Sequence, residues 1–368
     1  MKIGIFGGTF APPHNAHKEM LLCSISQLCL DKVFVLPCGN PPHKTTDTPK
    51  RHRKALTELA FSEIDKVIID YYEMNKRGQS YTLLTLKHYI KLFPGDELYL
   101  IIGGDSLRDF ALWRFPQQIA DIATLAVVGR SDIDLDANIE RIKQQFNARI
   151  VKVNMVANDI SSTRIRVAYQ FNLPQDLVSS QVDKYIKDNN LYASYAPKMA
   201  KLRRNLDQER YLHSFFTTIA GLSLPSNIEK ERVFLACALH DCAKNISQDE
   251  WKKYGFTNPN NCSAKVVHAE LGAIVARVDY GITDQEILDA IKYHTTARAN
   301  MTQLDKVVYI ADKVEESREY PTKHLFANTL DQTFVNVFKE AVEATLRKTN
   351  QLGIFTQQAI EYYLKEKI

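Results

Sequence analysis

Two histidines follow a pair of glycines near the start of the chain. The segment Gly7-Gly8-Thr9-Phe10 leads into His14 and His17. Glycine permits a close approach of a ligand to the backbone that a β-carbon would block. His14 and His17 are three residues apart, so within a helical turn both can face one ligand. Because imidazoles can donate hydrogen bonds to a phosphoryl group that gains charge, this spacing predicts a phosphate site.

A second polar cluster lies far along the chain. Ser161-Ser162-Thr163 leads directly into Arg164 and Arg166. Serine and threonine often cap helices, so simple capping is one interpretation. A helix N-terminus that carries hydroxyls and arginine is also an anion-binding arrangement. We expect a second phosphate site here, which could hold the β- and γ-phosphates of a nucleotide while the histidines hold the α-phosphate.

The second half of the chain places histidines and aspartates among apolar residues at helical spacing. A buried histidine or aspartate is costly unless it is paired or bound to a metal. One such residue is commonly a hydrogen-bonded core residue, but four or more on separate helices favour a metal site. Mixed imidazole and carboxylate ligands suit Fe, Mn, Co, Ni or Zn better than Ca²⁺. The candidates are His213, His240, Asp241, His268, His294 and Asp312.

His240 and Asp241 are adjacent in the sequence. Neighbouring residues on a regular helix do not face the same side. For both side chains to reach one ion, either the helix must be distorted at this point or the side chains must reach inward around it.

Residues 1–192 alternate short runs of β-branched and aromatic residues with helix-length stretches. Strands that alternate with helices form right-handed βαβ units, so we expect an α/β Rossmann-like domain with a mostly parallel sheet. Several strands are apolar on both faces, as a covered sheet requires. The expected strands are Lys2–Phe6, Lys32–Pro37, Val67–Tyr72, Glu97–Ile102, Thr124–Val128 and Arg149–Val153, and the expected helices include His17–Leu30, Arg51–Ser62 and Tyr81–Phe93.

The pattern changes after Leu191. Residues 193–197 combine alanine, serine, tyrosine and proline, which is typical of a short linker. From residue 198 to residue 368, apolar residues recur at helical spacing with almost no alternating runs. We therefore expect two domains, the second of them all-helical.

Bulk composition excludes several classes of protein. The chain has 368 residues and a formal net charge of +4, which is too weak a bias for a nucleic-acid wrapper. No run reaches the roughly 18 apolar residues that a membrane span needs. The six cysteines form no C-x-x-C pair, so we expect free thiols in a reducing compartment. A cytoplasmic protein with no nucleic-acid or membrane partner is expected, and a homo-oligomer is left open.

The motifs of the first half resemble those of the nucleotidyltransferase superfamily, and within it those of bacterial nicotinate-nucleotide adenylyltransferases. The two phosphate clusters read G-x-F-G-G-T-F-x-P-P-H-x-x-H at 4–17 and I-S-S-T-x-I-R at 160–166. Three further stretches carry the narrower resemblance: P-P-H-K at 41–44, Y-T-x-x-T-L at 81–86, and G-x-D-S at 103–106 followed by Trp113. The resemblance covers nearly all of residues 1–192.

This resemblance implies adenylyl transfer from ATP to nicotinate mononucleotide, which gives deamido-NAD and pyrophosphate with the help of Mg²⁺. The mononucleotide phosphate would attack the α-phosphorus directly, and catalysis would be positioning and charge stabilisation. Asp105 would accept a hydrogen bond from a ribose hydroxyl, and Trp113 would stack on the pyridine ring. The implied catalytic residues are His14, His17 and Arg166; those for ATP are Gly7, Gly8, Thr9, Phe10, Gly103, Asp105, Ser162, Thr163 and Arg166; those for the mononucleotide are Lys44, Thr82 and Trp113.

Two residues depart from the family pattern. Ala11 stands where the family usually has aspartate, and Ala16 stands where it has glycine. The missing carboxylate leads us to expect reduced rather than lost activity. The alternatives are a different adenylyl- or cytidylyltransferase, such as one that acts on phosphopantetheine, and a nucleotide sensor that binds without turnover.

The motifs of the second half resemble those of HD-domain metal phosphohydrolases, and more closely the bacterial HD-domain diadenosine tetraphosphate hydrolases. They are Y-L-H-S at 211–214, L-H-D-x-A-K at 239–244, H-T-T at 294–296 and A-D-K-V-E-E-S-R at 311–318. The resemblance implies symmetrical cleavage to two ADP. It is good over about residues 200–320, within a domain expected at 198–368.

On that resemblance one or two divalent transition-metal ions, with Fe favoured, would be bound. His213, His240, Asp241 and Asp312 would hold the first ion, and His268 and His294 a second ion or the phosphate. Outer phosphates would contact Lys244, Thr296 and Arg318. The alternatives are a nucleoside monophosphate phosphatase, a cyclic-nucleotide phosphodiesterase and a metal-bearing regulatory module.

Overall fold

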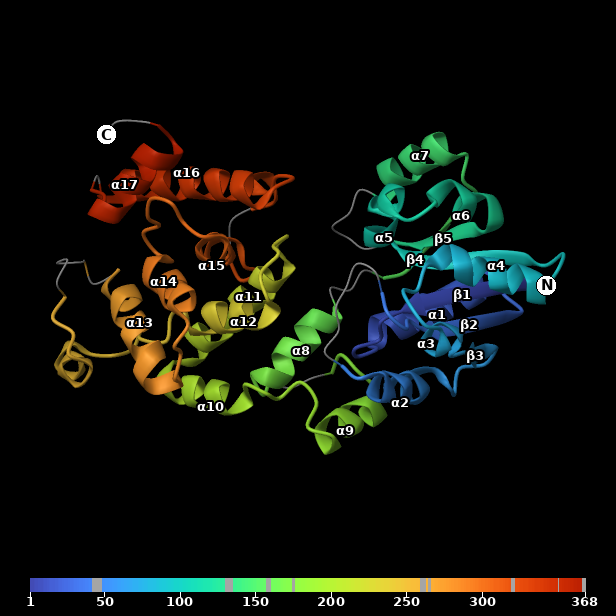
Figure 1. Ribbon diagram of the computed structural model, residues 1–368, viewed down its shortest axis with the longest axis horizontal. Helices are drawn as coiled ribbons and strands as arrows, with labels where there is room; N and C mark the ends of the chain where they lie inside the picture. The colour runs from blue at the N-terminus through green and yellow to red at the C-terminus, as the bar shows by residue number, and fades with distance from the viewer. Residues whose placement is uncertain are drawn as a thin grey trace. The chain divides into compact units, whose positions relative to one another are not determined.

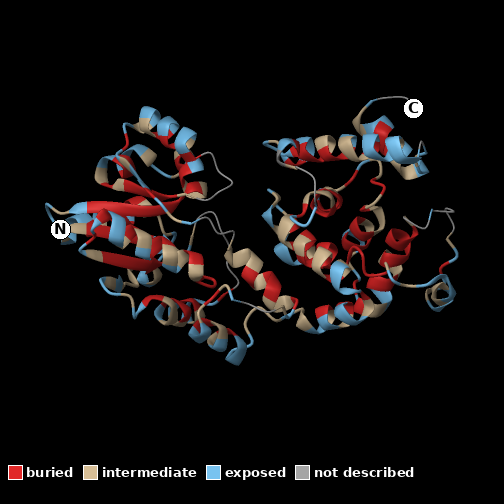
Figure 2. Ribbon diagram, turned by 180° about the vertical axis from the view of Figure 1, so that it is seen from behind, coloured by how far each residue is buried: buried red, intermediate tan, exposed pale blue. Residues whose placement is uncertain are grey.

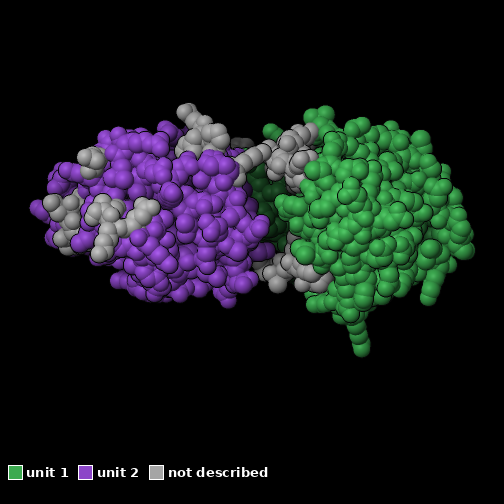
Figure 3. Space-filling view, turned by 90° about the horizontal axis from the view of Figure 1, so that it is seen from above, with its two compact units in different colours: residues 1–166, 174–192 green, residues 167–173, 193–368 purple. Residues whose placement is uncertain are grey.

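The structure is a computed structural model that describes residues 1–41, 48–129, 135–156, 160–173, 176–258, 263, 266–318, 322–349 and 351–365. Its chain divides into two compact units (Figure 3). The first unit comprises Met1–Arg166 and Pro174–Tyr192. The second comprises Val167–Leu173 and Ala193–Ile368. The assignment of Val167–Leu173 to the second unit was not expected from the sequence.

A six-stranded sheet forms the centre of the first unit (Figure 1). Every neighbouring pair of strands is parallel, in the order β3-β2-β1-β4-β5-β6. The expected α/β class with a parallel sheet is confirmed. The strands are β1 Lys2–Gly8, β2 Lys32–Pro37, β3 Val67–Ile69, β4 Glu97–Gly103, β5 Thr124–Val128 and β6 Ile150–Val153.

Helices cover both faces of this sheet, and each face has its own apolar core (Figure 2). Alternate residues of one strand enter different cores: Phe34 and Leu36 join one, and Val33 and Val35 join the other. This two-sided burial explains why the strands are nearly continuous apolar runs. The helices are α1 Asn15–Leu28, α2 Lys50–Phe61, α3 Tyr72–Asn75, α4 Thr82–Leu92, α5 Gly104–Arg108, the 3₁₀ helix η1 Phe110–Leu112, α6 Pro116–Ile122, α7 Leu135–Phe146, α8 Ser162–Gln170 and α9 Ser180–Asp188.

Strand β3 is shorter than the expected Val67–Tyr72. The Asp70 carboxylate accepts the backbone N–H of Tyr72 at 2.8 Å, which turns the chain into α3. Aspartate favours such local turns over a strand. The strand therefore ends at Ile69.

The second unit is helical throughout its described residues, which confirms the expected all-helical class. One apolar core holds it together and includes Val167, Ala168 and Phe171 from the end of α8. Asp207 caps α11 through the N–H of Arg210 at 2.9 Å. The elements are α10 Ala196–Asn205, α11 Gln208–Ser223, α12 Lys230–Leu239, η2 Gln248–Tyr254, α13 Val267–Tyr280, α14 Gln285–Tyr293, α15 Gln303–Val314, η3 Lys323–Leu325, α16 Leu330–Thr349 and α17 Ile354–Tyr363.

Two further expectations concern the whole chain. Among the described residues, none of the helices combines the length and apolarity required to traverse a bilayer. The described cysteines Cys23, Cys29, Cys38, Cys237 and Cys242 are free thiols, as expected. Cys262 lies outside the described residues.

Candidate functional site

The glycine pair lies where β1 ends, at the carboxyl edge of the sheet. The strand order reverses between β1 and β4, and ligands of open α/β sheets bind at such a switch point. A β-carbon on Gly8 would lie 2.6 Å from the Phe10 ring, whereas one on Gly7 would meet nothing within 4 Å. Gly8 is thus required by packing, and Gly7 leaves open space beside the backbone.

His14 and His17 lie at the start of α1, and their ring centroids are 3.6 Å apart. His14 is the N-cap of the helix and is almost fully buried. Its backbone N–H donates to Nδ1 of His17 at 3.3 Å. A neutral His17 therefore carries its proton on Nε2, where the ring can donate a hydrogen bond to a ligand.

The second phosphate cluster meets the loop that follows β1. The hydroxyl of Ser162 donates to the carbonyl of Pro12 at 2.9 Å. The guanidinium of Arg166 donates to the carbonyl of Ala11 at 2.9 Å and to the Thr163 hydroxyl at 3.1 Å. Segments some 150 residues apart in the sequence are thereby joined at the start of α8.

Asp105, expected to contact ATP, and the three residues expected to contact the mononucleotide come from several segments. Asp105 lies in the first turn of α5 and accepts the backbone N–H of Ser106 at 2.9 Å. Thr82 begins α4. Trp113 follows η1, is half-buried, and has its ring centroid 5.5 Å from that of Phe110. Lys44 lies outside the described residues.

A local break in the helix positions the adjacent pair His240 and Asp241. Helix α12 ends at Leu239, and the chain continues in tight turns in which Cys242 N–H donates to Leu239 O at 3.0 Å. Lys244 N–H likewise donates to Asp241 O at 2.9 Å. Both side chains are buried, with Nε2 of His240 3.8 Å from Oδ2 of Asp241, so distortion of the helix is the route by which the pair comes together.

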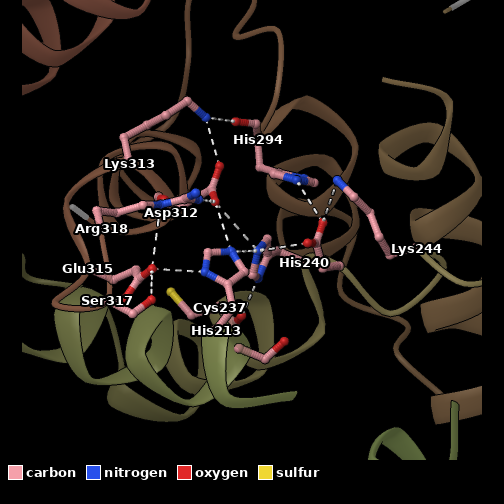
Figure 4. Close-up of polar contacts among 12 residues, drawn as sticks. His213, Cys237, His240, Lys244, His294, Asp312, Lys313, Glu315, Ser317 and Arg318 are labelled. Carbon is pink, nitrogen blue, oxygen red and sulfur yellow. Dashed lines mark hydrogen bonds and ion pairs between the residues drawn. The ribbon is translucent and has the colours of Figure 1, made fainter. Parts of the chain in front are cut away.

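Side chains from four segments converge in the second unit (Figure 4). Nε2 of His213, on α11, lies 3.1 Å from Nε2 of His240 and 3.0 Å from Oδ1 of Asp312, on α15. Nε2 of His294, directly after α14, lies 3.4 Å from Oδ1 of Asp241. Two groups of candidate ligands result, each with its ligand atoms within 4.8 Å of one another: His213, His240 and Asp312, and His240, Asp241 and His294.

The tautomers of these imidazoles fit a divalent transition ion. Nδ1 of His240 faces Cys237 O at 2.7 Å, and Nδ1 of His294 faces Ile291 O at 2.7 Å. A carbonyl can only accept, so each Nδ1 carries the proton and each Nε2 presents a lone pair to the centre. Neutral imidazoles held in this way, beside two carboxylates, are ligands of Zn, Fe or Mn.

Charges in this cluster also favour a cation. Burial lowers the pKa of His240 to about 3. Burial also opposes protonation of His213, but hydrogen bonds to Asp312 and Glu315 raise its pKa to about 9. Burial opposes ionisation of Asp241 and Asp312, yet a hydrogen bond from His268 to Asp241 and the charge of Lys313 beside Asp312 hold the pKa of each carboxyl well below its usual range. Both aspartates are thus ionised and are suited to attract a metal cation.

His268 differs from the other histidines because it belongs to neither candidate group. Its Nε2 lies 3.0 Å from Oδ1 of Asp241 and 3.0 Å from Nζ of Lys244. Burial lowers the pKa of Lys244. His268 and Lys244 therefore lie at the edge of the cluster, next to Asp241.

The other expected phosphate contacts lie in different surroundings. The Thr296 hydroxyl donates to Ala297 O at 2.9 Å. Arg318 donates to Asp312 O at 2.7 Å and to Asp312 Oδ1 at 2.8 Å. Two residues that the sequence did not single out also belong here: Lys313, whose Nζ donates to Asp312 Oδ2 at 2.7 Å, and the buried Glu315.

Comparisons with known proteins follow the same division of the chain. A cytidylyltransferase-like family model matches residues 5–168, and an HD domain model matches residues 206–317. A Mycoplasma genitalium protein named probable nicotinate-nucleotide adenylyltransferase/Ap4A hydrolase is 28% identical, over 86% of this chain and 88% of its own length.

Shorter relatives match one half each. A probable nicotinate-nucleotide adenylyltransferase from Clostridium tetani is 34% identical, over 52% of this chain and 98% of its own length. The crystal structure of a predicted HD superfamily hydrolase involved in NAD metabolism from Clostridium acetobutylicum is 27% identical. It covers 47% of this chain and 98% of its own chain, with a TM-score of 0.43. The chain therefore belongs to the nicotinate-nucleotide adenylyltransferase family and carries an HD domain in its second half.

Proposed function

We propose that the first unit transfers the adenylyl group of ATP to nicotinate mononucleotide, and releases deamido-NAD and pyrophosphate. The observation that carries this proposal is the junction of the loop at Ala11 and Pro12 with Ser162 and Arg166 at the start of α8. It gathers a guanidinium, hydroxyls, helix N–H groups and two imidazoles at one end of the sheet, and such donors stabilise charge on a phosphoryl group in transfer.

Each group has a defined task in this reaction. His17 donates from Nε2 to the α-phosphate, and Arg166 and Ser162 hold the departing pyrophosphate. Among the described residues, both three-ligand groups lie in the second unit. Mg²⁺ prefers phosphate oxygens and water, so the ion fits the first unit as a companion of ATP, where it supplies charge neutralisation.

Nicotinate-dependent pyrophosphate release tests this proposal against a sensor that binds ATP without turnover. We expect release that requires both ATP and nicotinate mononucleotide. Phosphopantetheine in place of the mononucleotide should give none. An inactive parent chain with an active Ala11→Asp variant would show that the missing carboxylate abolishes function, against our expectation.

We further propose that the second unit is a metal-dependent hydrolase that cleaves diadenosine tetraphosphate to two ADP. The convergence of Nε2 atoms and carboxylates at His213, His240 and Asp312 carries this proposal. A divalent ion held there, with Fe favoured, would supply Lewis acidity that makes water a nucleophile near neutral pH. Asp241 and His294 would hold a second ion, while His268 and Lys244 would contact phosphate.

Removal of metal is the direct test of the hydrolase. Treatment with a chelator should abolish cleavage of diadenosine tetraphosphate, and added Mn²⁺ or Fe²⁺ should restore it. In the proposed reaction the metal ion supplies the Lewis acidity that activates water. Products are separated by chromatography from a panel that includes nucleoside monophosphates and cyclic nucleotides. ADP as the sole product supports the proposal. Preferred turnover of another substrate assigns a phosphatase or phosphodiesterase, and metal binding without turnover assigns a regulatory module.

A further inference from the structure

Glu315 is a buried carboxylate at the edge of the candidate metal centre, with a relative exposure of 2%. It follows α15 directly and belongs to neither group of candidate ligands. Its Oε1 lies 3.1 Å from Nδ1 of His213 (Figure 4). The Ser317 hydroxyl donates to Oε1 at 2.6 Å, and the Ser317 backbone N–H donates to Oε2 at 2.6 Å.

His213 depends on this carboxylate because of its place in the chain. It lies inside α11, whereas His240 and His294 each follow the last residue of a helix and use a backbone carbonyl three residues before them. The backbone carbonyls near His213 accept the hydrogen bonds of the helix itself and are not open to the imidazole. A side chain from another element must therefore accept the Nδ1 proton, and Glu315 is positioned to do so.

We propose that Glu315 is a positioning residue of the metal centre. It fixes the ring of His213 and keeps its proton on Nδ1, so that Nε2 presents a lone pair to the ion. Arg318 ties the arrangement together, since it contacts Glu315 Oε1 at 3.4 Å and Asp312 Oδ1 at 2.8 Å. The inference rests on the proposed metal-dependent function and deepens it.

Metal affinity of the full chain tests this role. Glu315→Gln preserves the size of the side chain but removes its charge and one acceptor. With Mn²⁺ alone as the probe, we expect binding weaker by about 10–100-fold, the usual cost of losing such a partner. Glu316→Gln removes the charge of the next, exposed residue and should bind Mn²⁺ like the parent. Melting of each metal-free protein shows whether the fold is intact.

The outcomes separate the two levels of the proposal. If the parent chain does not bind Mn²⁺, the metal-dependent function itself fails. If the parent binds and folded Glu315→Gln binds equally well, the role of Glu315 is overturned. Should Glu315→Gln not fold, Ser317→Ala keeps the charge and removes one donor to Oε1. An affinity reduced by a few-fold then supports the role, and parental affinity contradicts it.

A separate observation concerns a buried arginine in the first unit. Arg53, on α2, has a relative exposure of 1%. Its guanidinium donates to Thr9 O at 3.3 Å, to Gly39 O at 3.1 Å and to Cys38 O. Among the described residues its Nε–H has no acceptor, and the partners of its guanidinium are these backbone carbonyls rather than a carboxylate. A buried charge without a counter-charge is costly and calls for an explanation.

The carbonyls that Arg53 contacts belong to two different loops. Thr9 lies in the loop after β1, beside the candidate phosphate site, and Gly39 follows β2 and opens the segment toward Pro41 and the mononucleotide motif. We infer that Arg53 is a positioning residue that holds the loop after β1, at Thr9, and the residues that directly follow β2, at Cys38 and Gly39, in one register, and that its charge is balanced by the phosphates of the bound substrates. This inference rests on the proposed adenylyl transfer.

Steady-state kinetics with chemical rescue test the role of Arg53. Arg53→Ala should lower kcat by about 10²-fold, as misplaced reactants do, and free guanidinium should restore part of the loss. Arg51→Ala, on the exposed side of the same helix, is the control. Folded Arg53→Ala with parental kcat overturns the inference, and so does a loss that guanidinium does not relieve. If Arg53→Ala does not fold, Arg53→Lys with parental kcat and KM overturns it. If the parent chain itself shows no nicotinate-dependent turnover, the proposed adenylyl transfer is contradicted instead.

Discussion

Single residues in this chain show how a backbone contact can choose the chemistry of a side chain. The N–H of His14 occupies Nδ1 of His17, which leaves the proton of a neutral ring on Nε2. At the other centre, backbone carbonyls and Glu315 occupy Nδ1 and leave lone pairs on Nε2. Opposite tautomers thus suit the two proposed tasks: donation to phosphate in the first unit and donation of an electron pair to a metal in the second.

His17→Ala tests the donor role. Loss of one donor to a developing charge typically costs about 10²–10³-fold in kcat, so we expect that reduction in nicotinate-dependent adenylyl transfer. Hydrolysis by the second unit, measured on the same preparation, should be unchanged. A raised KM with parental kcat would mean that His17 binds the ground state and the transition state equally, against the proposed role.

The sequence predicted the histidines and aspartates of the second unit as candidate ligands but assigned no role to Glu315 or Arg53. Histidine among apolar residues is a conspicuous pattern, since its burial must be compensated. A glutamate after a helix or an arginine within a polar helix resembles an exposed residue, because nothing local marks it as buried. Their role becomes visible only when the packing of α15 on α11, and of α2 beneath the loops, is known.

The positions of the strands and long helices were the part of the fold that could best be predicted from the sequence. All six strands were expected near their observed places because parallel strands are apolar on both faces. The short helices α3 and α5 were not expected, since four or five residues are too few to show a helical period. The joining of the α8 start to the Pro12 loop rests on long-range contacts, which the sequence indicated only through two phosphate clusters that could share one nucleotide.

Glycine substitutions can separate packing from ligand approach at the carboxyl edge of the sheet. A β-carbon on Gly39 would lie 2.1 Å from the carbonyl oxygen of Glu73, so Gly39→Ala should destabilise the first unit by about 1–3 kcal/mol. Gly7→Ala meets no protein atom within 4 Å and should melt like the parent, yet raise the KM for ATP. Calorimetry and kinetics measure the two effects. Equal melting of both variants would contradict the packing argument.

At the scale of the whole molecule, the end of α8 is part of the core of the second unit. Phe171 is 1% exposed, lies against Tyr211, Phe215 and Phe234, and its carbonyl accepts the Tyr211 hydroxyl at 2.6 Å. Truncation of such a side chain to alanine commonly costs about 3–5 kcal/mol.

Phe171→Ala should therefore lower the thermal transition of the second unit and leave that of the first near its parental value. Scanning calorimetry of the full chain resolves this if each transition is assigned by its ligand, ATP for the first and Mn²⁺ for the second. A shift confined to the ATP-sensitive transition would show that Phe171 belongs to the other core.

The path of the chain between residues 166 and 193 limits where the gene could be divided. The chain gives Val167–Leu173 to the second unit, returns to supply the remainder of the first through Tyr192, and only then leaves it. A cut after Tyr192 deprives the second unit of Phe171, and a cut before Val167 deprives the first unit of α9, which packs on α2. Two stable products from separate genes would need this stretch to be encoded twice, once at the end of one and once at the beginning of the other.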